Sequence, residues 1–278
     1  MPFDPPTNGA RQPAPPPLGP PQAPLETSPV APAAVTAGSL ATRTIRLWWQ
    51  NLGRFTGVLL LFFLPVMLLG VVAAIAIPTL AQRGVRLQDH MGGLFGFMAL
   101  IFAVSLPLAA IMLGGVSYGV VQHLAGRRVG VGAMLRQGGR RLWPLTAALA
   151  LVMLAVAGSY VLLIVPGIMV AIATAVALPA ATVETIGARA AFRRSLDLTR
   201  GYRWSIFGAF LLVVICQFAL NMVGNLAGLV HPVAGPLLSL VVTLPAASLP
   251  WVLPAVAYHD LRLAKEGVDT SALAAVFE

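Results

Sequence analysis

The amino-acid sequence predicts an all-α, polytopic membrane protein with six transmembrane helices, and three observations lead to this fold class. First, 58% of the 278 residues are hydrophobic and only 10% are charged, whereas soluble domains carry about 25% charged residues. Second, the chain contains apolar segments of about 20 residues, the length that a helix needs to cross a bilayer. Third, its 17 arginines and one lysine flank these segments and form no separate basic domain, so nucleic-acid binding is not expected.

Residues 1–38 precede the first apolar segment and contain 12 prolines. This composition offers too little apolar surface to offset the entropy of ordering, so we expect a disordered, Pro-rich cytoplasmic tail. The stretch PPPLGPPQAP could dock into an aromatic groove as a polyproline helix, or it could serve as a spacer. A secretory signal peptide is not expected, because no apolar core follows a basic start.

The transmembrane domain is predicted over residues 39–266, followed by a short cytoplasmic segment at 267–278. One apolar stretch, Leu145 to Val183, would form a helix of about 58 Å at 1.5 Å per residue, roughly twice the hydrocarbon thickness. The chain must therefore reverse within it, and Pro166-Gly167 is the predicted turn. The six predicted spans are 55–80, 94–121, 145–164, 168–183, 204–229 and 234–258.

Basic residues are distributed very unevenly over the two sides of this topology. Sixteen lie on one side, while the opposite loops hold only Arg83 and Arg86. The positive-inside rule places the basic side in the cytoplasm. The sequence thus predicts three hairpins with both termini cytoplasmic, in the inner membrane of a bacterium. A glycine, an arginine and an aromatic residue recur before each odd-numbered span, through shared topology or through duplication, and indicate a basic interfacial segment ahead of each hairpin.

The stretch ARAAFRRSLDLTRG, within residues 187–201, predicts an amphipathic helix on the cytoplasmic membrane surface. One face is charged, with Arg189, Arg193, Asp197 and Arg200 at helical spacing. The other face is expected to contact acyl chains and carries Ala191, Ser195, Leu198 and Tyr202. Anionic lipid headgroups are the expected partners of the basic residues, in particular of Arg189, Arg200 and Arg203.

Two segments, LPAATVETIGARAAFRRSLDLTRGYRW at residues 178–204 and AYHDLRLAKEGVD at residues 257–269, carry a family resemblance. They resemble a family of bacterial six-helix membrane proteins that includes the membrane domain of some glycerophosphodiester phosphodiesterases. The resemblance covers about residues 42–275 and implies the six-helix fold. It implies no phosphodiesterase activity, because no residues remain to build the catalytic barrel of about 250 residues. The matching positions are Pro179, Glu184, Ala191, Arg194, Ser195, Leu198, Thr199, Gly201, Trp204, Tyr258, Asp260, Leu261, Arg262, Glu266 and Gly267.

The fifth predicted span carries three amides at every fourth residue, Gln217, Asn221 and Asn225. They would either bond to a neighbouring helix or line a substrate path. Gly224 and Gly228 beside them would allow a helix to approach closely, within the chain or in a dimer. The sixth span contains four prolines that are expected to kink it, either for packing or for ligand binding: Pro236, Pro245, Pro250 and Pro254.

Two carboxylates are predicted at the cytoplasmic ends of spans four and six, Glu184 and Asp260. Because a desolvated carboxylate needs a cationic partner, we expect them to pair with Arg193 or Arg194 as a structural clamp. The alternative is a catalytic carboxylate pair.

No recognisable catalytic, cofactor or metal motif accompanies these features. His90, His123, His231 and His259 are scattered, and Cys216 is the single cysteine. The sequence therefore predicts a non-catalytic membrane protein, a scaffold or accessory component in envelope or lipid physiology, with lipids and a possible protein partner or homo-oligomer as its contacts. The alternatives are a transporter or lipid-moving protein that uses the fifth and sixth spans, and an intramembrane enzyme with an unfamiliar site.

Overall fold

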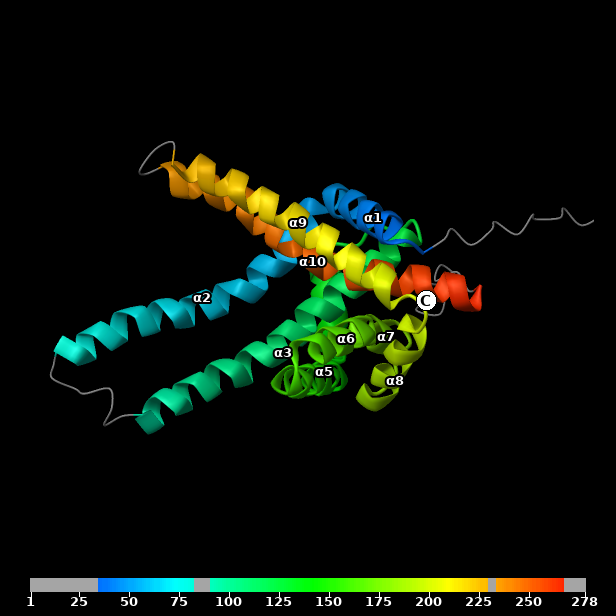
Figure 1. Cartoon of the computed structure of the whole chain (residues 1–278). Coiled ribbons are helices and arrows are strands. Elements are labelled where there is room, and N and C mark those ends of the chain that lie inside the picture. Colours follow the sequence, from blue (N-terminus) through cyan, green and yellow to red (C-terminus); the bar gives the residue numbers. More distant parts are fainter. Residues whose placement is uncertain (1–34, 83–90, 230–233, 268–278) are drawn as a thin grey trace, which may run out of the picture. The chain divides into compact units, whose positions relative to one another are not determined.

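The structure, a computed structural model, describes residues 35–82, 91–229 and 234–267 (Figure 1). Within these ranges the chain forms α-helices and no strand, so the predicted all-α class is confirmed. Several predicted features lie outside the described residues: the Pro-rich tail up to residue 34, the loops that contain Arg83, Arg86, His90 and His231, and the C-terminal segment from residue 268.

Among the described residues, six helical segments are long and apolar enough to cross a membrane, which agrees with the six predicted spans. They are α2 (Leu52–Gln82), α3 (Met91–Leu124), α5 (Leu142–Leu162), α6 with α7 (Ile164–Thr174 and Ala177–Val183), α9 (Arg203–Gly228) and α10 (Ala234–Glu266). The last helix continues beyond residue 258, where the sequence predicts the end of the span. This extension places Tyr258, Arg262 and Glu266 on one helix.

A shorter helix precedes each of α2, α5 and α9: these are α1 (Ala37–Gln50), α4 (Val131–Arg140) and α8 (Ala188–Thr199). α1 begins with a capping box, in which Thr36 and Ser39 each accept a hydrogen bond from the other's backbone N–H, at 3.2 and 3.1 Å. Further along α1, the indole N–H of Trp48 donates to the hydroxyl of Ser248 on α10 at 2.8 Å. The buried face of α1 therefore lies against the bundle.

The turn between the third and fourth spans lies at Leu163, and the predicted turn at Pro166-Gly167 is wrong. Leu163 has extended backbone and separates α5 from α6. Pro166 instead occupies the first turn of α6, where a missing N–H leaves no hydrogen bond unmade. Gly167 lets α6 approach α5, because a Cβ there would stand 2.6 Å from the ring of Tyr160.

The second half of α10 forms the centre of the described bundle. Most of its residues from Ala246 to Arg262 are buried, with α1, α2, α3 and α9 packed around it. Pro245, Pro250 and Pro254 lie inside α10, and the helix nevertheless continues through all three. Neighbouring helices commonly tolerate such prolines by packing around the freed backbone groups.

The small-residue spacing predicted in the fifth span, Gly224 with Gly228, serves a contact within the chain. A Cβ on Gly224 would meet the side chain of Thr243 at 2.7 Å, and a Cβ on Gly235 would stand 1.9 Å from the carbonyl oxygen of Gly228. The backbones of α9 and α10 therefore lie in direct contact. Gly115 and Gly119 of α3 face Met134 of α4 in the same way.

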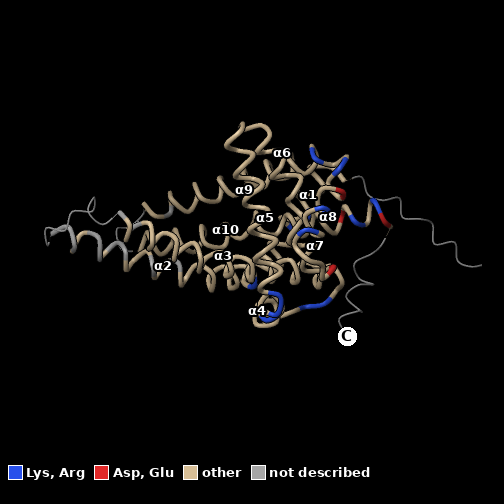
Figure 2. The backbone as a smooth tube through the Cα atoms, turned by 90° about the horizontal axis from the view of Figure 1, so that it is seen from below, with Lys and Arg blue, Asp and Glu red and all other residues tan. Residues whose placement is uncertain are grey.

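The charged residues of the described chain gather at one end of the long helices (Figure 2). The outer parts of α2, α3, α9 and α10 carry uncharged residues, and large apolar side chains such as Leu68, Phe95 and Val241 are exposed there. The outer halves of α5 and α6 are also exposed, and Figures 1 and 2 together show this pair leaving the bundle in a different direction from α9 and α10. Extensive apolar exposure is the property that a hydrocarbon environment requires.

Candidate functional site

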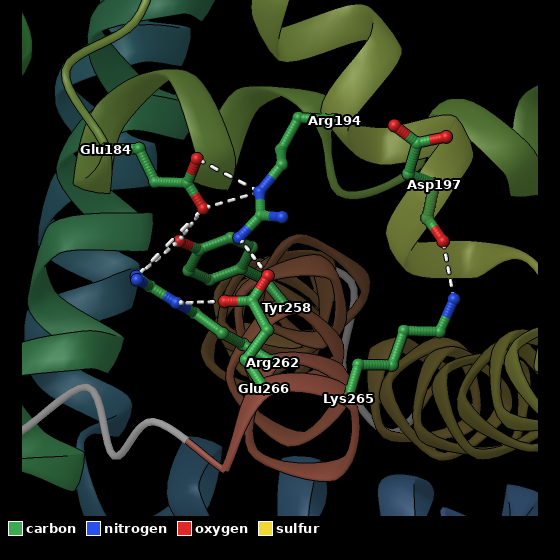
Figure 3. A network of polar contacts seen from close by, with 7 residues as sticks. All are labelled: Glu184, Arg194, Asp197, Tyr258, Arg262, Lys265 and Glu266. Carbon is green, nitrogen blue, oxygen red and sulfur yellow. Dashed lines mark hydrogen bonds and ion pairs between the residues drawn. The ribbon is translucent and has the colours of Figure 1, made fainter.

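A cluster of charged side chains joins the ends of α7 and α10 to α8 (Figure 3). Glu184 directly follows α7, and its backbone N–H still donates to the carbonyl of Ala180 at 2.9 Å. Thr185 then adopts a φ of 55°, a left-handed value that is unusual for a β-branched residue. The chain turns sharply here, so α8 packs beside α7 and brings Arg194 to the carboxylate of Glu184.

Arg194 forms ion pairs with two carboxylates from different helices. Its Nε donates to Oε1 and Oε2 of Glu184 at 2.8 and 3.0 Å, and its Nη2 lies 2.5 Å from Oε1 of Glu266. The side chains of Glu184, Arg194 and Glu266 are only 16%, 26% and 27% exposed. Since partial burial strengthens the attraction between charges and raises the cost of an unpaired one, each member depends on the others.

Three residues of α10, spaced four apart, close the network. The hydroxyl of Tyr258 donates to Oε1 of Glu184 at 2.9 Å, and Nη1 of Arg262 donates to the Tyr258 hydroxyl at 3.1 Å. Nε of Arg262 donates to Oε2 of Glu266 at 3.0 Å. Two carboxylates, two guanidinium groups and one phenol thus form a closed ring with no net charge. We call this set the ion-pair ring: Glu184, Arg194, Tyr258, Arg262 and Glu266.

The electrostatics of the ring favour permanent charge on Arg194. Burial alone would lower the pKa of Arg194, but its hydrogen bonds to Glu184 and Glu266 raise the pKa above its ordinary value. A guanidinium group that stays protonated can orient and stabilise, but it cannot relay protons. The arrangement is therefore suited to fastening helices together.

α8 also covers the end of α6. The hydroxyls of Ser195 and Thr199 donate to the carbonyl oxygen of Ala173 at 2.8 and 3.2 Å. Because α6 ends at Thr174, the carbonyls of its last turn need partners from outside the helix. The face of α8 assigned to acyl chains is thus covered by protein, with Ala191 and Leu198 fully buried. Small and hydroxylated side chains on that face fit a helix end better than hydrocarbon.

The other members of the predicted clamp lie elsewhere. Arg193 is exposed on the outer face of α8. Asp260 points away from the ion-pair ring and pairs with Arg43 of α1 at 2.5 Å. The reason is the helical period, which turns position 260 about 200° away from position 258. Asp260 therefore fastens α1 to α10, while Glu184 fastens α7 to α8.

Lys265 adds a further link between α10 and α8. Its ammonium group donates to the backbone carbonyl of Asp197 at 2.5 Å and lies 5.9 Å from the centre of the Tyr202 ring. A cation at this position binds the last turn of α8, where carbonyl groups concentrate negative partial charge. α8 is consequently held at both its middle and its C-terminal end.

The predicted headgroup ligands differ in their surroundings. Arg189 and Arg200 are exposed on α8. Arg203, at the start of α9, is half-buried, and its buried Nε has no hydrogen-bond partner within the described chain. It lines a groove between α6 and α9.

The predicted polar face of α9 is only partly covered. Gln217 and Asn221 are half-buried and Asn225 is exposed, and none of the three side chains has a hydrogen-bond partner among the described residues. The contact with α10 is made beside them, by Gly224 and Gly228. The amides therefore face the edge of the α9–α10 pair.

Tyr258, Arg262 and Glu266 are not part of the clamp that the sequence predicts. Their spacing of four residues was a usable signal, since it puts all three on one face of a helix, but the predicted span ended at residue 258. They also belong to the segments that carry the family resemblance, as do the other two members of the ion-pair ring.

Within the described ranges, no group of three or more His, Cys, Asp or Glu side chains is arranged to hold a metal ion. Comparison of the chain with protein-family models, curated proteins and solved structures finds no match in any of the three.

Proposed function

We propose that this protein is a non-catalytic integral membrane protein that acts as a scaffold or accessory component in envelope or lipid physiology, in the cytoplasmic membrane of a bacterium. The observation that carries the proposal is the ion-pair ring, which ties three helices together with matched charges. Its carboxylates and guanidinium groups are bound to one another, as a permanent structural fastening requires. The fastened helices present a charged surface on which a partner can bind.

The proposed topology has three membrane hairpins, formed by α2 with α3, α5 with α6 and α7, and α9 with α10. Both termini, α1, α4, α8 and the ion-pair ring would face the cytoplasm. Support comes from the one-sided distribution of charge in the described chain (Figure 2), because arginine and lysine are retained on the cytoplasmic side of short loops. This membrane topology agrees with the proposed resemblance to the membrane domains of glycerophosphodiester phosphodiesterases.

Cysteine labelling in whole cells tests this topology. In a Cys216→Ser background, we expect Leu229→Cys to react with a membrane-impermeant maleimide from outside, while Gly132→Cys and Gly187→Cys react only after the cells are opened. The three introduced cysteines lie at exposed positions, and the native Cys216, which is partly exposed, is removed so that it cannot react. Labelling of Gly187→Cys from outside would overturn the topology.

A pull-down from native membranes with protein and lipid analysis tests the scaffold role. We expect the wild type to retain a stoichiometric protein partner and Arg194→Ala to lose it, because the charged end loses its fixed geometry. Arg193→Ala is the matched control, since the adjacent Arg193 is exposed and lies outside the ion-pair ring. Recovery of a small-molecule substrate without a stoichiometric partner would contradict the scaffold.

A transporter or lipid-moving protein is the second candidate, and the unpaired amides of α9 are the observation that favours it. Amides in hydrocarbon without partners are costly unless they face water or a substrate. Asn221→Leu separates the two functions. If the unfolding midpoint in detergent is unchanged and solute uptake or lipid transfer is lost, transport is favoured; unchanged uptake leaves the scaffold as the better explanation.

A further inference from the structure

A groove of about 460 Å³ lies between α6 and the beginning of α9. One wall is formed by Ile168, Met169 and Ile172 of α6, and the other by Arg203, Trp204 and Phe207 of α9. The volume falls within the range of about 300 to 1,000 Å³ that is usual for small-molecule sites. Its lining is apolar apart from a single cationic side chain.

Arg203 is the only charged residue that lines this groove. Its Nε is buried and has no hydrogen-bond partner in the described chain, and no carboxylate among the described residues lies within ion-pair distance of it. The ion-pair ring, by contrast, matches every guanidinium group to a carboxylate. The guanidinium group of Arg203 as a whole is half-buried, and a partly buried cation without a counter-charge costs free energy, so Arg203 is complementary to an anion that the described residues do not supply.

The groove also lies at the level where the long helices meet the charged end. Arg203 is the first residue of α9, and Trp204 beside it is 84% exposed. An arginine and a tryptophan at the end of a span mark the headgroup region of a bilayer, whereas the lining from Phe207 and α6 continues as hydrocarbon-like surface. A ligand that fills the groove must therefore be anionic at one end and apolar along the rest.

We propose that the groove between α6 and α9 binds one anionic phospholipid, with its phosphate on the guanidinium group of Arg203 and an acyl chain against Ile168, Ile172 and Phe207. Inorganic phosphate would leave the apolar walls unfilled, and a neutral lipid would leave Arg203 without a counter-charge. The proposal rests on α9 crossing the membrane and does not depend on the scaffold role, so either can fail without the other.

Native mass spectrometry of the full-length protein, released from nanodiscs that contain phosphatidylglycerol and phosphatidylcholine, tests this site. We expect the wild type to retain one phosphatidylglycerol in preference to phosphatidylcholine. Arg203→Gln should weaken retention about tenfold, the effect of losing one charge-assisted hydrogen bond. Arg200→Gln is the matched control, because Arg200 is three residues away, equally basic and exposed outside the groove; its retention should match the wild type.

Two further measurements keep the test decisive. Met169→Trp leaves the charge in place and fills the groove, so it should weaken preferential retention at least as much as Arg203→Gln. It replaces Arg203→Gln in the test if that variant does not fold. Inorganic phosphate at millimolar concentration should not displace the lipid. Equal losses in Arg203→Gln and Arg200→Gln would mean general surface attraction, and displacement by phosphate would mean a simple anion site. Either outcome, or equal retention of both lipids, would overturn the proposal.

Discussion

The two ends of α10 are stabilised by different interactions. From Tyr258 to Glu266 the helix is held by directional bonds, through the ion-pair ring to α7 and α8 and, via Asp260, to α1. From Ala234 to Thr243 it has no ion pair in the described chain; it touches α9 through close backbone contacts at Gly235 and leaves Leu237 and Val241 exposed. One end of the bundle is therefore fixed by the protein itself, whereas the other depends on van der Waals packing and on the surrounding lipid.

Removal of Glu184 should have the largest effect, because its carboxylate accepts hydrogen bonds from both Arg194 and Tyr258. We expect Glu184→Ala to lower the free energy of unfolding in detergent by about 3 kcal/mol, the cost of leaving a partly buried partner charge unpaired. Thermal or denaturant unfolding measures this change. Asp197→Ala is the control, since the side chain of Asp197 is exposed and its contact to Lys265 uses the backbone; a loss as large as that of Glu184→Ala would disprove the role of the ring.

A double-mutant cycle tests whether the ring acts as a unit. Arg194→Ala should be strongly destabilising in the wild type and about 2 kcal/mol less so when Glu184 and Glu266 are already glutamine, because contacting charges are energetically coupled. The same substitution combined with Asp260→Asn should be additive, since Asp260 pairs with Arg43 and belongs to a separate link. Equal penalties in all backgrounds would show that no coupled network exists.

At the N-terminal end of α10, the free energy of unfolding should depend on side-chain volume and not on charge. Gly235→Ala places a Cβ against the carbonyl of Gly228 and should cost about 1 to 3 kcal/mol, the usual penalty of overpacking. Gly70→Ala in α2 is the matched control, because a Cβ there meets nothing within 4 Å. We expect the Gly70 variant to be no less stable than the wild type and up to about 1 kcal/mol more stable, because alanine favours a helix over glycine. If Gly235→Ala is equally harmless, α9 and α10 are not in backbone contact at this end.

The sequence predicted the helices of this fold better than the partners of their side chains. Hydrophobic length depends only on local composition, so the six candidate spans and the amphipathic α8 were readable from the chain. The position of the turn at Leu163 was not, because proline is as acceptable in the first turn of a helix as in a tight turn. Glu184 is a candidate because it lies at the end of the fourth predicted span, and Arg194 because it lies in the adjacent arginine-rich segment. Their connection to Arg262 and Glu266 depends on how far α10 continues, which tertiary packing decides.

The smallest expected effect concerns the backbone beside the ion-pair ring. Thr185 has a φ of 55° and an exposed side chain, a conformation that costs an L-residue with a Cβ about 1 to 2 kcal/mol. Glycine removes this strain but gives the unfolded chain more freedom, which returns about 0.4 to 1 kcal/mol. We therefore expect Thr185→Gly to raise the free energy of unfolding by about 0.5 kcal/mol, while Thr185→Ala, which keeps a Cβ, should gain less.

The strain at Thr185 also connects the turn to the ring. Before the turn, Glu184 is held by Arg194 and Tyr258. After the turn, α8 is held by its contacts with Ala173 and Lys265. Glu184 and α8 therefore cannot relax independently of each other. Strained backbone persists where surrounding contacts over-determine it. In a Glu184→Ala background one of these restraints is gone, the turn can relax with threonine in place, and Thr185→Gly should no longer stabilise. An equal gain in both backgrounds would mean that the ion-pair ring does not impose this turn.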